Sequence, residues 1–97
     1  MIRHLVLFRF KPGVTAGSSE IKHIHEAMQA LPGKIPGIRD WQHGVNVTPD
    51  AEAWDYALSA SFDDKQTLFT YFEHPAHLDV ISLWNDVAEL SFVDLES

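Results

Sequence analysis

The sequence contains no cysteine, and this absence excludes several kinds of chemistry. A chain without thiols forms no disulfides, offers no thiolate nucleophile and holds no metal through sulfur. Basic residues are also few: 7 Lys and Arg stand against 14 Asp and Glu, for a formal net charge of −7. Nucleic-acid backbones and anionic membrane surfaces attract clusters of Lys and Arg, so neither is an expected partner.

Long apolar runs are missing as well, and no stretch is long enough to cross a bilayer. The first residues lead directly into an alternating strand pattern and lack the features of a signal peptide. We therefore expect a cytoplasmic protein. A length of 97 residues predicts one domain, residues 1–97, with a small core that self-association would extend.

The order of apolar and polar residues predicts four strands and two helical regions. The strands are expected at residues 2–10, 38–47, 54–62 and 90–95, and the helices at 18–31, from 63 or 64 to 72, and from Pro75 to about Ala88. Pro32 and Gly33 are expected to lie in the connection after the first helix. This β-α-β-β-α-β order predicts an α+β, ferredoxin-like fold, in which an antiparallel four-stranded sheet carries the helices on one face.

Two leucines of the first strand are expected to face away from the helices. Leu5 and Leu7 alternate with His4, Val6 and Phe8, so the two sets occupy opposite faces of the sheet. Leaving leucine in water costs about 25 cal/mol per Å² of apolar surface. The third strand offers small side chains on the same face, which suits close packing of two sheets. We therefore expect a homodimer through the face opposite the helices.

The segment from Tyr71 to His77 combines a phenol, two imidazoles and a helix-breaking proline. Pro75 disfavours helix at His74 and suits the first position of a new helix, so one helix is expected to end just before His74. This break would let Tyr71 and His77 turn toward one spot and form a proton-handling pair. A purely structural alternative is a backbone-bonded histidine beside a core tyrosine with a hydrated tip.

Several stretches of the chain match one known family. They are residues 4–15, 35–38, 44–46, 59–62, 71–77 and 93–94, of which the first-strand histidine and the Tyr-x-x-His-Pro-x-His run are the specific parts. With these the chain resembles the stress-responsive dimeric A/B-barrel (Dabb) family, within the dimeric α+β barrel superfamily. The resemblance implies a ferredoxin-like monomer that pairs into an eight-stranded barrel.

A plant polyketide cyclase of that family supplies an expectation for the site. Its catalytic Tyr and His correspond to Tyr71 and His77, and its first-strand pocket histidine corresponds to His4. Tyr56 stands where that enzyme has a second pocket histidine, and Leu95 stands where the family usually has a tyrosine near its end. The family resemblance does not imply one activity, but the resemblance to this enzyme implies a cofactor-free cyclase or lyase that closes a ring by an intramolecular aldol step.

Aldol chemistry needs a base beside a carbonyl and a donor for the developing oxyanion. An imidazole titrates near physiological pH, and the positive end of a helix keeps it neutral, so His77 is the expected base. Tyr71 is the expected oxyanion donor. An aromatic-lined pocket suits a small apolar or aromatic carbonyl ligand. The expected pocket and substrate-binding residues are His4, Tyr56, His74 and Trp84, with His74 also capping the second helical piece.

Two other functions fit the same pattern. One is a dimeric binding or stress-associated protein without turnover, in which the histidines hold the fold. The other is a cofactor-free oxygenase, as found among relatives in the superfamily. No metal site is expected, because the spacing of His74 and His77 matches no strong metal signature. His23 and His25 fall on different helix faces and are expected to be ordinary helix residues.

Overall fold

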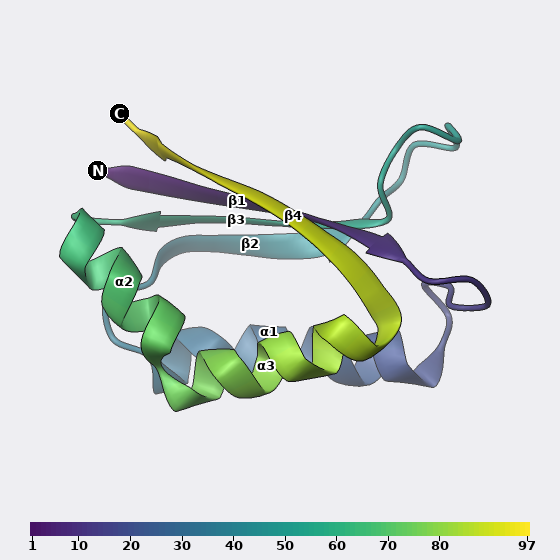
Figure 1. The fold of residues 1–97 in the computed structure, drawn as a ribbon, viewed down its shortest axis with the longest axis horizontal. Coiled ribbons are helices and arrows are strands. Elements are labelled where there is room, and N and C mark those ends of the chain that lie inside the picture. The colour runs from purple at the N-terminus through teal and green to yellow at the C-terminus, as the bar shows by residue number, and fades with distance from the viewer.

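The computed structural model describes residues 1–97, and its elements follow the predicted order (Figure 1). The strands are β1 (Ile2–Phe10), β2 (Arg39–Val45), β3 (Tyr56–Phe62) and β4 (Ala88–Glu96). The helices are α1 (Ser19–Lys34), α2 (Lys65–Glu73) and α3 (Pro75–Val87). The second helical region is divided in two, as the proline predicts.

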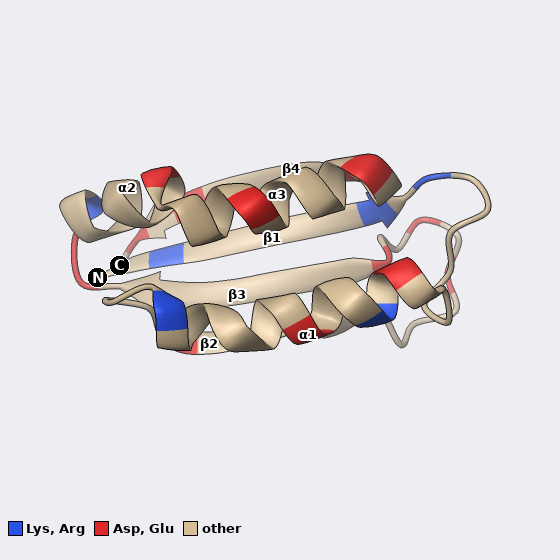
Figure 2. Cartoon of the chain, turned by 90° about the horizontal axis from the view of Figure 1, so that it is seen from below, with Lys and Arg blue, Asp and Glu red and all other residues tan.

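The strands form one antiparallel sheet in the order β2-β3-β1-β4. All three helices lie on one face of this sheet, and the opposite face is open (Figure 1). Seen from the helix side, α1 and α3 run side by side along the strands, and acidic residues are spread over the outward helix surfaces and the loops (Figure 2). The predicted ferredoxin-like α+β fold is confirmed.

The core lies between the sheet and the helices. Val6 and Phe8 of β1 are buried against the helices, whereas Leu7, on the other face, is 47% exposed. Trp84 of α3 stacks on Phe8 with ring centres 4.0 Å apart. The remaining helix contribution comes from Ile21, Ile24, Met28 and Leu31 of α1 and from Val80 and Val87 of α3. Large side chains therefore fill the middle of this layer.

The end of α1 differs from the prediction, because the helix continues through Pro32 to Lys34. A proline has no N–H, so Pro32 leaves the carbonyl of Met28, four residues earlier, without its helical donor. The indole Nε1–H of Trp41 on β2 donates to that carbonyl over 3.0 Å. A tertiary hydrogen bond thus replaces the missing helical one and lets α1 pass the proline.

Strand lengths also differ from the prediction. β4 occupies Ala88–Glu96 rather than 90–95, because it pairs with β1 along the whole of Ile2–Phe10. β3 begins at Tyr56 and not at residue 54, and β2 ends at Val45 rather than at residue 47. Beside the start of β3, the Asp55 carboxylate accepts the Phe10 N–H over 2.8 Å.

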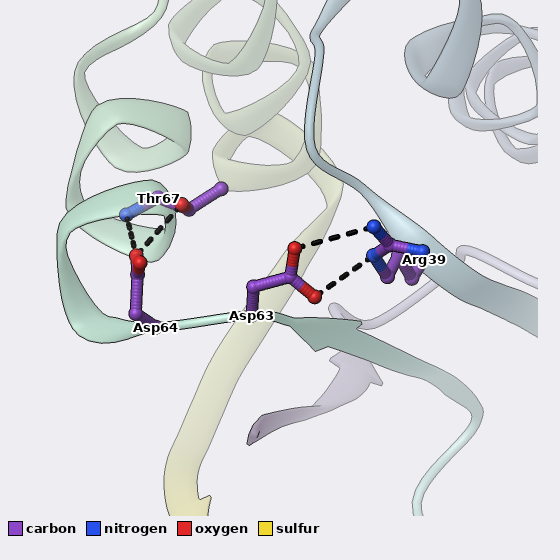
Figure 3. A network of polar contacts seen from close by, with 4 residues as sticks. All are labelled: Arg39, Asp63, Asp64 and Thr67. Atoms are coloured by element: carbon purple, nitrogen blue, oxygen red, sulfur yellow. Dashed lines mark hydrogen bonds and ion pairs between the residues drawn. The ribbon is translucent and has the colours of Figure 1, made fainter.

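Side chains cap the starts of both α2 and α3. Asp64 Oδ1 accepts from the backbone N–H of Thr67 at 2.8 Å and from its hydroxyl at 2.7 Å, which fixes the start of α2 beside the Arg39–Asp63 ion pair (Figure 3). His74 follows α2 in an extended conformation, and its Nδ1 accepts the N–H of Ala76 over 3.1 Å. The break at residues 74–75 and the capping role of His74 are therefore confirmed.

Candidate functional site

Tyr71 and His77 come together on the helix-covered side of the sheet. Tyr71 lies in the last turn of α2 and His77 in the first turn of α3, with ring centres 4.3 Å apart and planes tilted by 46°. Their spacing would separate them on a continuous helix, where neighbours on one face are three or four residues apart. The change of direction at Pro75 therefore creates the contact.

Hydrogen bonding fixes the proton on one nitrogen of His77. Its Nδ1 lies 3.0 Å from the carbonyl oxygen of Phe72, which only accepts, so Nδ1 carries the hydrogen. Nε2 then has a free lone pair, and no protein atom hydrogen-bonds it. Burial is the main reason that the pKa of His77 is lowered from its ordinary value; the Phe72 bond raises it, and His4 and His74 lower it further. His77 is thus neutral and basic at Nε2 near pH 7.

Tyr71 provides the matching proton donor. Its side chain is buried, and its hydroxyl forms no hydrogen bond with the protein. Burial, followed by the negative charge of Asp94, raises the pKa of the Tyr71 phenol above its ordinary value. The phenol therefore stays protonated and is available to donate to an oxygen of a ligand.

His4 forms the third polar group of this site. Its Nδ1 lies 2.6 Å from Oδ1 of Asp94, which is its cross-strand partner on β4. Its ring lies edge-on to Tyr71, with 5.8 Å between ring centres. Asp94 therefore orients the imidazole of His4 and also acts on Tyr71. The sequence analysis missed this role of Asp94, since it depends on the register between β1 and β4.

One small cavity connects these groups. His4, Tyr71, His77 and Trp84 line it together with Phe8 and other apolar side chains, and its volume is about 20 Å³. A single water needs about 10–15 Å³, so the cavity is closed to larger molecules in this conformation. Trp84 is fully buried, and its Nε1–H has no hydrogen-bond partner. A ligand larger than water requires side chains at the edge of the cavity to move.

Two predicted pocket residues lie elsewhere. His74 caps α3 and does not line the cavity. Tyr56 is opposite Phe8 in the register, whereas His4 is opposite Ala60, and Tyr56 is therefore displaced along the sheet. Its hydroxyl instead contacts Nδ1 of His25 at 2.8 Å and Nδ1 of His43 at 2.5 Å. His25 is an exposed residue of α1, and its hydrogen bond to Tyr56 on β3 was not predicted.

Comparison with known proteins gives the family. Residues 2–96 match the profile described as Stress responsive A/B Barrel Domain. The chain belongs to this family. An uncharacterised protein of Streptomyces coelicolor is 38% identical over 96 residues, which cover 99% of each chain. Olivetolic acid cyclase of Cannabis sativa is 27% identical over 79 residues, which are 79% of this chain and 76% of the cyclase.

Solved structures share the architecture. A dimeric ferredoxin-like protein of unknown function from Thermobifida fusca has a TM-score of 0.87 at 25% identity, covering 99% of this chain and 90% of that one. A hydroxynitrile lyase from Passiflora edulis has a TM-score of 0.83 at 18% identity, covering 97% and 90%. A cofactor-independent oxygenase from Streptomyces nogalater has a TM-score of 0.72 at 10% identity, covering 99% and 91%. At such identities, the two enzymes show the fold alone.

Two further observations concern this A/B-barrel chain. Its side chains form no group of three or more His, Cys, Asp or Glu that could hold a metal ion. None of its helices combines the length and the apolar character that crossing a bilayer requires.

Proposed function

We propose that this protein is a cofactor-free lyase or cyclase that acts on a carbonyl compound through Tyr71 and His77. The observation that carries the proposal is the contact between a neutral imidazole with a free Nε2 and a protonated phenol, 4.3 Å apart between ring centres. A base and an oxyanion donor side by side are what enolisation needs. The similarity to olivetolic acid cyclase, 27% identical over 79 residues, supports the same class of reaction.

The reaction would begin with transfer of a proton from carbon to nitrogen. The C–H bond beside the carbonyl breaks, its proton goes to Nε2 of His77, and its electron pair moves to the carbonyl oxygen. Tyr71 donates its O–H to that oxygen. In an aldol step, the enolate carbon then attacks a second carbonyl of the same molecule, and His77 returns the proton to the new alkoxide. Nδ1–H stays bonded to Phe72 throughout.

Asp94 and His4 would shape this site without exchanging the substrate proton. The carboxylate accepts from His4 Nδ1, so Nε2 of a neutral His4 accepts hydrogen bonds. A substrate hydroxyl could donate to it. Loss of the Asp94 carboxylate would leave the imidazole of His4 free to rotate, and we therefore treat Asp94 as a positioning residue.

Substrate entry would open the outer edge of the cavity. His77 lines the cavity and is half-buried, and the half-buried ring of Phe72 lies beside it with 5.9 Å between ring centres. Phe92 of β4 is 64% exposed, with its ring centre 6.2 Å from that of Phe72. Movement of these two rings would admit an apolar or aromatic body, whereas Trp84 is locked against Phe8. We therefore propose a substrate whose reacting carbonyl enters first and whose remainder lies against Phe72 and Phe92.

We also infer that two copies pair through the open face of the sheet. Leu7, Val93 and Leu95 are each about half exposed there, and a hollow of about 600 Å³ lies over Leu5, Leu7, Ser59, Ser91 and Val93. Burial of these side chains against a second sheet is favourable. The related Thermobifida fusca protein is described as dimeric, which supports this arrangement.

Exchange of ketone protons for deuterium tests the proposed activity. Acetone and acetophenone in deuterated buffer form a series of increasing size, and NMR follows loss of the proton signal beside the carbonyl. We expect the protein to accelerate exchange, and His77→Gln and Tyr71→Phe to lower the rate, with His23→Gln as a surface control. Equal rates for all four proteins would contradict the proposal and favour a binding protein without turnover.

A further inference from the structure

A second cluster of proton-handling side chains lies between α1, β2 and β3. Tyr56 of β3 is fully buried, with its ring centre 5.5 Å from that of Phe8 and 4.9 Å from that of Trp84. Its hydroxyl contacts Nδ1 of His25 on α1 at 2.8 Å and Nδ1 of His43 on β2 at 2.5 Å. Two histidines from different elements thus meet on one fixed hydroxyl.

The hydrogen bonds of this cluster specify its protons. Oε1 of Gln29 accepts from Nε2–H of His43 over 2.5 Å, so Nδ1 of His43 carries a lone pair. The Tyr56 hydroxyl then donates to that Nδ1 and accepts from Nδ1–H of His25. His25 is left with a lone pair on Nε2. One arrangement of hydrogens therefore satisfies the row of hydrogen bonds from His25 through Tyr56 and His43 to Gln29. In this arrangement Nε2 of His25, at one end of the row, is the basic atom.

The basic end of this row borders a separate groove of about 320 Å³, which is open to solvent because most of its lining residues, His25 among them, are exposed. His25 and Tyr56 line it together with Ala16, Ile21, Lys22, Glu26 and Val45, and none of these residues lines the Tyr71–His77 cavity. The walls are apolar apart from Lys22 and Glu26, whose opposite charges leave no net charge. Such a groove fits a small, flat, neutral molecule whose hydroxyl approaches His25.

We propose that His25, Tyr56 and His43 form a second acid–base site, at which His25 takes the proton of a bound phenol or enol and Tyr56 relays the charge to His43. The ligand O–H bond breaks, and its proton goes to Nε2 of His25. Nδ1–H of His25 passes to the Tyr56 oxygen while the Tyr56 proton passes to Nδ1 of His43. Tyr56 stays neutral, and the positive charge ends on His43, whose Nε2–H is held by Gln29.

The electrostatics of the cluster agree with a relay that carries one proton and depends on the bound anion. Burial raises the pKa of the Tyr56 phenol, so a free phenolate is disfavoured. In the relay Tyr56 gains one proton as it loses another and therefore never becomes a phenolate. Burial, followed by the charge of His25, lowers the pKa of His43, so a positive charge on His43 is disfavoured in the free protein and requires the negative charge of the bound phenolate. The rings of His25 and His43 are 4.7 Å apart, so two positive charges at once are unfavourable. The charged groups facing the cluster are Lys22 and Glu26 of α1.

Titration of the histidines by ¹⁵N NMR tests the relay. If Tyr56 shares one proton between His25 and His43, both imidazoles respond to the first protonation at one common midpoint. In Tyr56→Phe the two midpoints are expected to separate, and exposed His23 provides an internal reference in each sample. Gln29→Leu should allow the other tautomer of His43. Separate midpoints in the wild type, or a common midpoint that persists in Tyr56→Phe, would overturn the relay.

Binding of 4-nitrophenol tests the ligand assignment, because the colour of its phenolate reports proton transfer. We expect the bound probe to be deprotonated at a pH where it is neutral in buffer. His25→Leu should weaken binding by about tenfold, as expected for one lost hydrogen bond to a charged group. His77→Leu should leave binding unchanged, which separates this site from the proposed function. Equal binding by wild type and His25→Leu, no binding, or loss in His77→Leu alone would each overturn the proposal.

Discussion

The ring of His77 lies 4.3 Å from that of Tyr71, although the two residues belong to different helices. Their contact depends on the extended conformation of His74, which ends α2 and caps α3. The pair is buried to different degrees: Tyr71 is enclosed, while His77 is half-buried at the cavity edge. A proton donor without a protein partner and a base with a free nitrogen are thus held together by a break in one helical region.

Removal of the Tyr71 hydroxyl should not destabilise the fold. This hydroxyl belongs to a residue that lines the small cavity, and it makes no hydrogen bond with the protein, so Tyr71→Phe breaks no hydrogen bond within the fold. The matched change Tyr56→Phe removes a hydroxyl with two hydrogen bonds and should cost about 1–3 kcal/mol. Urea denaturation measures both free energies of unfolding. A larger loss in Tyr71→Phe than in Tyr56→Phe would show that Tyr71 is a structural residue.

Stability should fall on mild acidification because of His77 and His43. Burial lowers the pKa of both below the ordinary value of about 6.5. Between the folded and unfolded pKa values the unfolded chain binds more protons, so stability rises with pH across this window and is lost as pH falls through it. The hydrogen bonds from Thr67 lower the pKa of Asp64, so its contribution to stability is lost only at more acidic pH, below the ordinary aspartate pKa of about 3.9.

Denaturation at a series of pH values and one protein concentration checks this behaviour. The free energy of unfolding should decrease as pH falls below about 6.5, and His77→Gln should flatten the decrease by removing one of the two groups. His23→Gln, which changes an exposed histidine of α1, should leave the slope unaltered. A slope that is the same in His77→Gln and in the wild type would contradict the pKa shift of His77.

The hydrogen bond from Trp41 to Met28 should matter only because of Pro32. In the natural chain, Trp41→Phe leaves the Met28 carbonyl without a donor and should cost about 1 kcal/mol beyond the change in packing. In a Pro32→Ala background, the new backbone N–H can satisfy that carbonyl, so the same change should cost less. A double-mutant cycle measured by urea denaturation isolates this coupling. Equal costs in both backgrounds would rule out the proposed compensation.

The fold was largely predictable, because its signals are local. Alternation over residues 2–10 marks β1, and Pro75 marks the corner that brings Tyr71 to His77. The end of α1 was not predictable: Pro32 reads as a helix end, and only a tryptophan from β2 allows the helix to continue.

The site was predictable only in part, since hydrogen-bond partners depend on strand register. His4 could be placed on the helix-covered face by alternation, but its pairing with Asp94 requires the β1–β4 alignment. The cluster of His25, His43 and Tyr56 joins three elements and carries no short sequence motif. A polar residue at a position that alternation predicts to be buried, such as His43 or Tyr56, is the signal that could have suggested it.

Dimer formation should depend on the open face of the sheet. Leu7→Asp places a charge among apolar side chains that a second sheet would cover, so it should dissociate the dimer. The matched control is Leu78→Asp, because Leu78 is 54% exposed and lies on α3. Sedimentation at micromolar concentration distinguishes the two states. A monomeric wild type, or a dimer that survives Leu7→Asp, would contradict the inferred interface.

The pH dependence of ketone exchange, measured beside the ¹⁵N titration of His77, tests the central claim most directly. If Nε2 of His77 is the base, the exchange rate should fall as His77 becomes protonated, and both curves should share one midpoint below about 6.5. The ¹⁵N spectrum should also show the hydrogen on Nδ1, as the bond to Phe72 requires. Exchange that continues unchanged through the titration of His77, or that persists in His77→Gln, would contradict the account.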